Sequence, residues 1–95
     1  MTMAADRRLL LLSEQDNVVV ALVNLQRGET VNIDGDAVVL AADAPLGFKV
    51  ARRALNVGDK VLKYGAAIGS ATAEISRGEV VHLHNLKSNY LPTHS

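Results

Sequence analysis

The chain has 95 residues, of which 48% are hydrophobic and only 3% aromatic, and this length predicts one small domain with an aliphatic core. Ten basic and ten acidic residues balance, so the chain lacks the positive excess typical of proteins that bind nucleic acid. Cysteine is absent, which excludes disulfides, thiolate nucleophiles and Cys-ligated zinc within the chain.

An apolar run near the N-terminus, residues 9–12, resembles the start of a signal peptide only superficially. It is four residues long and polar residues 13–17 follow it at once. Such a run is too short for an export signal and for a membrane span. We therefore expect a cytoplasmic protein without membrane contact.

In chain order, short apolar runs alternate with turn signals. Strands are predicted over residues 9–12, 18–23, 31–33, 37–40, 48–51, 61–65, 66–74 and 80–85. Asp34-Gly35-Asp36 predicts a tight hairpin and residues 43–47 a turn, whereas 52–55 are expected to form one helical turn. The glycines of 66–74 favour a bent strand or a close approach of two backbones. We expect one domain with a core at about 8–87 and an extended tail at 88–95.

One pattern recurs along the chain: an aliphatic residue, two spacers, glycine, an acid, one spacer and valine. It occupies residues 25–31, 55–61 and 75–81. In such a unit the aliphatic residue anchors in the core, glycine adopts a positive φ, and valine begins a strand. Repeated glycine corners predict strands that bend and change partners, so the expected fold is a compact all-β domain of short strands and hairpins.

The sharpest candidate site is His82-Leu83-His84-Asn85. On a strand, His82 and His84 would share one face about 6.5–7 Å apart, with Leu83 directed into the core. Two imidazoles on one face can bind a divalent metal or a substrate carboxylate, and Asn85 would lie near the strand end. The alternative is an exposed polar face with no ligand.

Other residues are weaker candidates. Lys49, Lys63 and Lys87 are able to bind a carboxylate or acidify a neighbouring C–H, although lysines usually cover the surface. Tyr64 is either a hydrogen-bond donor to substrate or an amphipathic cap of the core. For Asp16-Asn17 we favour a turn-capping role over a ligand role.

The order of these motifs resembles a SAF domain, specifically the small N-terminal domain of the altronate and galactarate dehydratase family. The resemblance rests on Lys63-Tyr64-Gly65-x-x-Ile68-Gly69, on the segment from Gly78 to Lys87, and on the segments that begin at Asp16 and Pro45. It covers roughly Asp16 to Lys87 and implies a β-clip fold of bent hairpins.

The resemblance also implies a function and a partner. Members of the family remove water from a sugar acid and form a 2-keto-3-deoxy acid, with a divalent metal, commonly iron, and with a large domain that carries most of the active site. Some members divide the two domains between chains, among them a sulfolactate sulfo-lyase. We therefore expect a lyase subunit that is inactive alone, with a large dehydratase subunit and a sugar acid as partners, and a homo-oligomer is also compatible.

The implied site contains His82, His84 and Lys63 as catalytic residues and Asn85, Lys49 and Tyr64 as substrate-binding residues. His82 and His84 would also contribute to a metal that is bound mainly by the partner. One departure concerns Phe48, because relatives often carry His between Gly47 and Lys49. This departure points to a different acid or to greater reliance on the large subunit.

Two alternatives stay open at the level of sequence. SAF-like domains also occur in sialic-acid synthases and in flagellar or pilus assembly proteins, so a non-catalytic binding or interaction module is the second hypothesis. A stand-alone enzyme is the third, and the small size of the domain argues against it because little cavity is available for a whole active site.

Overall fold

The computed structural model describes residues 6–88, and this range contains strands but no helix, which confirms the predicted all-β class. Every strand pair is antiparallel. The strands are β1 (Leu9–Leu10), β2 (Val18–Ala21), β3 (Thr30–Ile33), β4 (Asp36–Val39), β5 (Lys49–Ala51), β6 (Lys60–Lys63), β7 (Ala66–Ala71), β8 (Val80–Val81) and β9 (Leu86–Ser88).

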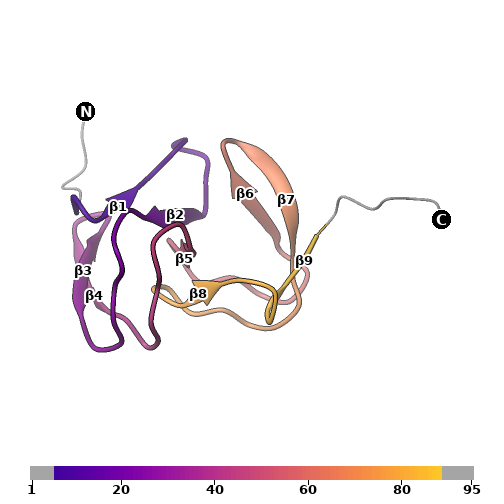
Figure 1. Ribbon diagram of the computed structural model, residues 1–95. Helices are drawn as coiled ribbons and strands as arrows, with labels where there is room; N and C mark the ends of the chain where they lie inside the picture. Colours follow the sequence, from indigo (N-terminus) through magenta and orange to yellow (C-terminus); the bar gives the residue numbers. More distant parts are fainter. Residues whose placement is uncertain (1–5, 89–95) are drawn as a thin grey trace.

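A four-stranded sheet in the order β1-β2-β5-β8 occupies the middle of the molecule. The β3-β4 hairpin lies to one side of it, and a three-stranded sheet in the order β6-β7-β9 lies to the other (Figure 1). Strands far apart in sequence are therefore neighbours in the central sheet. This arrangement agrees with the prediction that glycine corners let the strands change partners.

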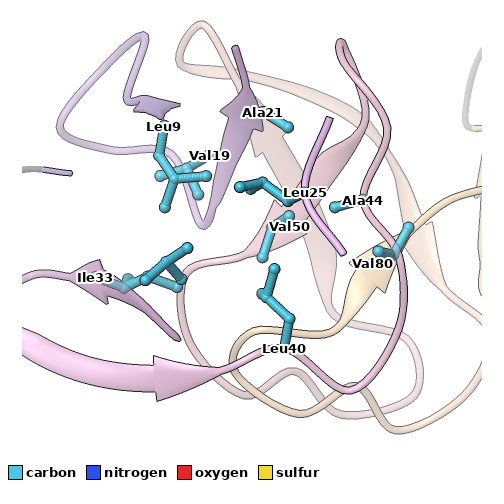
Figure 2. Packing of buried hydrophobic residues seen from close by; sticks show 10 residues of the cluster. Leu9, Val19, Ala21, Leu25, Ile33, Leu40, Ala44, Val50 and Val80 are labelled. Carbon is cyan, nitrogen blue, oxygen red and sulfur yellow. The ribbon is translucent and has the colours of Figure 1, made fainter. Parts of the chain in front are cut away.

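The central sheet separates two aliphatic cores. Val19, Val50 and Val80 lie opposite one another in register and belong to the first core. Val18 and Ala51 pair one position along, so they point to the other face and belong to the second core. Figure 2 shows the first core, where side chains from β1, β2, β5 and β8 meet those of the β3-β4 side. The second core comprises Val18, Ala51, Leu55, Val61, Ala71, Ile75 and Val81.

The glycine corner occurs four times in the structure, once more than the sequence pattern predicts. Gly28, Gly47, Gly58 and Gly78 have φ between +88° and +90°. The four corners form two pairs. The bridge Leu25–Ala44 joins the corners at Gly28 and Gly47, and the bridge Leu55–Ile75 joins those at Gly58 and Gly78. Each glycine N–H donates to a carbonyl of a distant segment, for example Gly28 to Leu40 and Gly58 to Ala71. The positive φ is needed here because it turns the chain from the bridge into the next strand.

Two arginines fasten the tip of the β3-β4 hairpin to the rest of the molecule. Arg52 Nε donates to Asp34 Oδ2 at 2.8 Å, and its Nη1 donates to the carbonyls of Glu14 and Asp16. Arg77 Nη1 donates to Asp36 Oδ2 at 2.8 Å. The Asp34-Gly35-Asp36 signal therefore forms the predicted hairpin, with Asp34 at φ +53°, and its acids also serve as partners for these arginines.

Several predicted elements were wrong in detail. The strands predicted over 18–23, 61–65 and 66–74 end earlier, at Ala21, Lys63 and Ala71. Residues 52–55 form no helical turn, because Leu55 is held in a bridge to Ile75. The first strand ends at Leu10, not at residue 12. The predicted strand over 80–85 ends at Val81. The predicted tail contributes β9 up to Ser88, and its remaining residues lie outside the described range.

Gly69 confirms the expected close approach of two backbones. A Cβ at this position would meet the Lys87 carbonyl and the Leu86 side chain of β9. The register of the β6-β7 pair shifts between Val61 and Leu62, so β7 carries one extra residue opposite β6. The small-residue segment is thus a bulged strand against which β9 packs closely.

Candidate functional site

The segment His82–Asn85 is a turn, which overturns the predicted strand geometry. Leu83 is 83% exposed, so it does not face the core. The N–H of Asn85 donates to the carbonyl of His82 at 3.0 Å, which closes the turn. His82 and His84 therefore do not project from one strand face. His84 is exposed and His82 is partly buried.

Asn85 is the residue that shapes this turn. Its side chain is 2% exposed, its Oδ1 accepts the N–H of His82, and its Nδ2 donates to the carbonyl of Val80, both at 2.9 Å. The amide oxygen and one amide hydrogen of Asn85 are therefore used to satisfy backbone groups of the turn. The predicted contact between Asn85 and substrate stays a prediction, while the structural role of its amide is clear.

His82 stacks on Phe48. The ring centroids are 4.4 Å apart and the planes differ by 26°. Phe48 itself packs against the first core just before β5 begins. Phe48 is therefore in direct contact with the first candidate histidine.

The local sequence explains why an aromatic residue is tolerated at position 48. In three corners the acid after glycine accepts the N–H of the residue three positions earlier, as Glu29 does from Gln26 at 2.7 Å. In the fourth corner the equivalent earlier residue is Pro45, which has no N–H to satisfy. Because no acceptor is required, Phe48 takes the position of the acid. The missing acid is also the reason why the sequence pattern failed to reveal the fourth corner.

Lys49 and Lys63 form a second pair of candidate residues. Lys49 lies opposite Val20 and Val81 in the central sheet, and cross-strand partners share a face. Val81 belongs to the second core, so Lys49 points to the side of the sheet that faces the β6-β7 hairpin. Burial, and then the charge of Lys63 at the end of β6, lower the pKa of Lys49 below its usual value.

Tyr64 follows Lys63 at the tip of the same hairpin. It is 73% exposed, so its alternative role as a cap of the core is wrong. Its φ is +61°, a region that bulky side chains rarely adopt, and Gly65 follows at +74°. An exposed aromatic side chain in a strained turn is often a sign of a functional constraint. Its predicted contact with substrate stays a prediction.

Asp16 and Asn17 hold this hairpin in place. Asp16 accepts the N–H groups of Tyr64 and Gly65, and the Asn17 amide bonds to the backbone of Lys60 and Leu62, with distances of 2.7–2.8 Å. Both residues are at most 2% exposed. The expected structural role is thus confirmed, but the turn that they cap lies far away in sequence.

The six predicted site residues do not converge on one point. Lys49 and Lys63 influence each other on the second-core side of the central sheet, while His82 stacks on Phe48, which packs against the first core. His84 is exposed, and Lys87, the weaker lysine candidate, lies exposed on β9. The candidate residues therefore fall into two separate sets: Lys49 and Lys63 in one, and His82 and His84 of the turn in the other.

The donor set of this chain does not fit a complete metal site. Among residues 6–88 no group of three or more His, Cys, Asp or Glu side chains is arranged to hold a metal ion. A catalytic metal usually takes three protein ligands, whereas only His82 and His84 were predicted here, and one of them is stacked on Phe48. Within the same described range no helix is long and apolar enough to cross a membrane.

The architecture and these groups define an all-β domain of bent hairpins that presents cationic and imidazole side chains, with no cluster of three potential metal ligands among residues 6–88. Comparison with known proteins agrees with this description. The sequence profile of the altronate/galactarate dehydratase SAF domain matches residues 7–89. The chain belongs to this family.

Relatives of known function are longer proteins or subunits. The chain is 38% identical to altronate dehydratase of Bacillus subtilis (strain 168) over 78 residues, which are 82% of this chain and 16% of the relative. It is 43% identical to altronate dehydratase of Escherichia coli (strain K12) over 74 residues, 78% of this chain and 15% of the relative. It is also 47% identical over 47 residues to the (2R)-sulfolactate sulfo-lyase subunit alpha of Paracoccus pantotrophus, 50% of this chain and 70% of that subunit.

Proposed function

We propose that this chain is the small SAF part of a two-part sugar-acid dehydratase and acts together with a large catalytic polypeptide. The main support is the pattern of coverage. Most of the chain matches altronate dehydratases, yet the match spans only 15–16% of their length. A sulfo-lyase relative is itself called subunit alpha. A small domain that lacks a complete site in its described part is suited to supplying groups to a larger one.

The proposed reaction removes the proton alpha to the carboxylate of a sugar acid and expels the beta hydroxyl as water. Lys49, Lys63 and Tyr64 bind the acid, while His82 and His84 lie at the boundary with the large polypeptide and serve proton transfer. Asn85 holds their turn in shape through its buried amide. A divalent metal, with iron as the first candidate, is bound mainly by the large polypeptide. The described residues 6–88 do not supply a fitting ligand set for this metal.

The exposed turn at 82–85 supports the role of a boundary. Leu83 is the most exposed of the large hydrophobic residues between positions 6 and 88, at 83%, and His84 follows it in the chain. The backbone of the turn is held in place, because the buried Asn85 amide makes two hydrogen bonds to it. A rigid turn that displays an apolar and an imidazole side chain is a suitable contact for another protein.

The test is co-expression of the chain with the large dehydratase-like chain encoded nearest to it, followed by an assay for water loss from altronate. We expect the two chains to co-purify and turnover to require both. The double variant His82→Ala/His84→Ala should retain association and lose about a hundredfold or more in kcat, the typical contribution of general acid–base groups. Gln26→Ala, which changes an exposed side chain at the corner between β2 and β3, is the matched control.

Two results would contradict this proposal. Full turnover by the large chain alone would remove the small chain from the reaction. Unchanged turnover and metal content in the double histidine variant would refute the assignment of these residues. Association without any effect on turnover would instead favour the second hypothesis, a non-catalytic interaction module.

A further inference from the structure

Two strands at the margins of their sheets, β6 and β8, have outer backbone groups that are bonded by an asparagine side chain. On β6, Asn17 Nδ2 donates to the Lys60 carbonyl and Asn17 Oδ1 accepts the N–H of Leu62, both at 2.8 Å. On β8 the Asn85 amide makes the two corresponding bonds at 2.9 Å. Each amide occupies the C=O of one residue and the N–H of the residue two positions later, which are the groups that an added strand would use.

The outer edge of β3 is closed by a pair of charged side chains. Asp6 Oδ2 accepts the N–H of Asn32 at 3.0 Å, and Arg8 Nη2 donates to the carbonyl of Thr30 at 2.8 Å. Arg8 and Asp6 are themselves joined by an ion pair at 2.7 Å. Thr30 and Asn32 are therefore the residues of β3 whose backbone groups point away from β4.

The same alternation identifies the backbone groups of β4 that point outward. The N–H of Leu40 bonds back to the residue before β3 at 2.9 Å, whereas Thr30 and Asn32 bond outward. Hydrogen-bonded and non-hydrogen-bonded pairs alternate along an antiparallel hairpin. Val39 and Ala37 lie opposite Thr30 and Asn32, so they direct both their N–H and C=O groups away from β3.

This outer edge of β4 is open. β3 is the strand that pairs with β4, and within residues 6–88 no hydrogen bond reaches the outward groups of Ala37 or Val39. Both residues are exposed, Val39 at 63%. Gly78 lies beside one end of the edge, where a Cβ would come 3.9 Å from the Val39 carbonyl, but its N–H is donated to Ala51. An open edge with exposed apolar residues is a template for another strand.

The sequence of this edge also favours pairing. Residues 37–42 carry no charge and contain neither glycine nor proline, whereas protected edges usually carry lysine or proline. Asp36, at the start of β4, is engaged by Arg77. The β3-β4 hairpin lies on the opposite side of the central sheet from the β6-β7-β9 sheet (Figure 1). A strand added to β4 is therefore remote from Lys63 and Tyr64.

We propose that β4 pairs with β4 of a second copy of this chain, antiparallel and about a two-fold axis at Val38. In this register Ala37 of each copy lies opposite Val39 of the other. Each such pair exchanges two N–H···O bonds, so every outward group of both edges is satisfied. The Val39 side chain of each copy covers Ala37 of the other, and no charge faces a like charge. The inference goes beyond the proposed function and does not depend on it.

The closed edges explain why this pairing stops at a dimer. The joined hairpins form one sheet in the order β3-β4-β4-β3, and its outer edges are the β3 edges that Asp6 and Arg8 already occupy. A two-fold contact uses the same patch on both copies and is complete when two copies have met. A second copy thus accounts for the open edge of β4 together with the closed edge of β3.

The experiment measures the oligomeric state of the full chain by sedimentation velocity and the exchange of its backbone amides by NMR. We expect a concentration-dependent dimer in which the Ala37 and Val39 amides exchange at least about tenfold more slowly than in the monomer. Val39→Pro removes an outward N–H and leaves the ladder with β3 intact, because Val39 donates nothing to β3. This variant should weaken association about tenfold or more.

Two charge variants separate edge pairing from misfolding. Ala37→Lys/Val39→Lys places lysines opposite one another across the two-fold axis, and Ala37→Asp/Val39→Asp does the same with carboxylates. Each variant alone should be folded and monomeric, and an equimolar mixture of the two should form a heterodimer. Ala66→Lys/Ala67→Lys makes the same charge change at exposed positions of β7 and is the matched control, which should associate like the wild type.

Three results would overturn the inference: a wild-type chain that is monomeric at every concentration, equal loss of association in the β7 control, or a mixture of the charge variants that does not associate. The edge has another conceivable occupant, an extended segment of the large polypeptide. If the chain alone is monomeric and its Ala37 and Val39 amides become protected only when the large polypeptide is added, that segment occupies the edge and pairing with a second copy is refuted.

Discussion

Asp16 and Gly65 lie 49 positions apart in sequence, yet Asp16 Oδ1 accepts the backbone N–H of Gly65 at 2.7 Å. The other carboxylate oxygen accepts the N–H of Tyr64 at 2.8 Å. The Asp16 side chain is buried, so this bond network joins the loop before β2 to the tip of the β6-β7 hairpin in a site with little competing water. The Asp16 carboxylate therefore helps to fix the position of Tyr64 and Gly65 relative to the central sheet, together with the bonds from Asn17 to Lys60 and Leu62.

Asp16→Ala is therefore expected to lower the free energy of unfolding by about 2–4 kcal/mol, because two N–H groups lose a charged acceptor. Urea denaturation followed by circular dichroism measures this change. Glu74→Ala, which removes an exposed carboxylate, is the control and should change stability by less than about 0.5 kcal/mol. Equal stability of the Asp16 variant and the control would show that the hairpin tip is held in another way.

Tyr64→Asn should increase stability. The backbone at position 64 has φ +61°, and asparagine tolerates this region better than tyrosine does. We expect a gain of about 0.5–1 kcal/mol in the free energy of unfolding, measured by thermal or urea denaturation. If Tyr64 contacts substrate as proposed, the same variant should bind altronate more weakly. A variant that is less stable than the wild type would show that the exposed ring stabilises the turn.

Gly78 and Gly28 form a matched pair of glycines that separates backbone strain from packing. Their φ values are +88° and +89°, but a Cβ at Gly78 would lie 2.5 Å from Val38 Cγ1, whereas nothing lies within 4 Å at Gly28. Gly28→Ala should cost about 1 kcal/mol of stability from the backbone alone, and Gly78→Ala about 2–4 kcal/mol because overpacking is added.

The double variant Gly78→Ala/Val38→Ala tests the cause of this difference. If the contact with Val38 is responsible, the interaction term of the double-mutant cycle should be favourable by about 1 kcal/mol or more. Denaturation curves of the wild type, the two single variants and the double variant measure this interaction term. Equal costs at Gly28 and Gly78 would contradict the packing argument.

Lys63→Gln should raise the pKa of Lys49. Burial lowers this pKa from its ordinary value of 10.5, and the charge of Lys63 lowers it further. Between the folded pKa and 10.5 the unfolded chain binds more protons than the folded chain, so stability rises with pH across this window. Removing the charge of Lys63 narrows the window and makes the rise smaller.

An NMR titration of the Lys49 side chain measures the pKa directly, and urea denaturation between pH 7 and the alkaline limit of folding measures the stability. Lys60→Gln is the control and should leave the Lys49 titration where it is in the wild type. A Lys49 midpoint that does not move upward in Lys63→Gln would show that the two ammonium groups do not interact.

The sequence was sufficient for the class of fold because its signals are local. Asp34-Gly35 adopts positive φ at both residues and forms its hairpin as predicted. The glycine after an aliphatic anchor also acts locally, since positive φ is cheap only for glycine. Local rules of this kind gave the all-β class and the corners at Gly28, Gly58 and Gly78. The turn predicted over residues 43–47 is confirmed at Gly47, but the repeat pattern did not identify it as a fourth corner, because Pro45 and Phe48 replace the hydrogen-bonded pair found in the other three.

The candidate site was less predictable because it depends on contacts between distant segments. Strand alternation predicted that Leu83 faces the core. In the structure the strand ends at Val81, and the buried Asn85 amide stabilises a turn in its place. The pairing of Lys49 with Lys63 depends on how the β6-β7 hairpin packs on the central sheet. Residue types and spacing carry no information on such packing.

The sequence by itself thus determined which residues turn the chain, that the domain consists of short strands, and to which family the chain is similar, since all of these depend on residue identity and near neighbours. Only the tertiary structure decided that His82 stacks on Phe48, that burial lowers the pKa of Lys49, and that Asp16 holds the β6-β7 hairpin. The physical reason is that these contacts arise when two small cores pack on opposite faces of one sheet, and the order of residues along the chain does not specify which groups then meet.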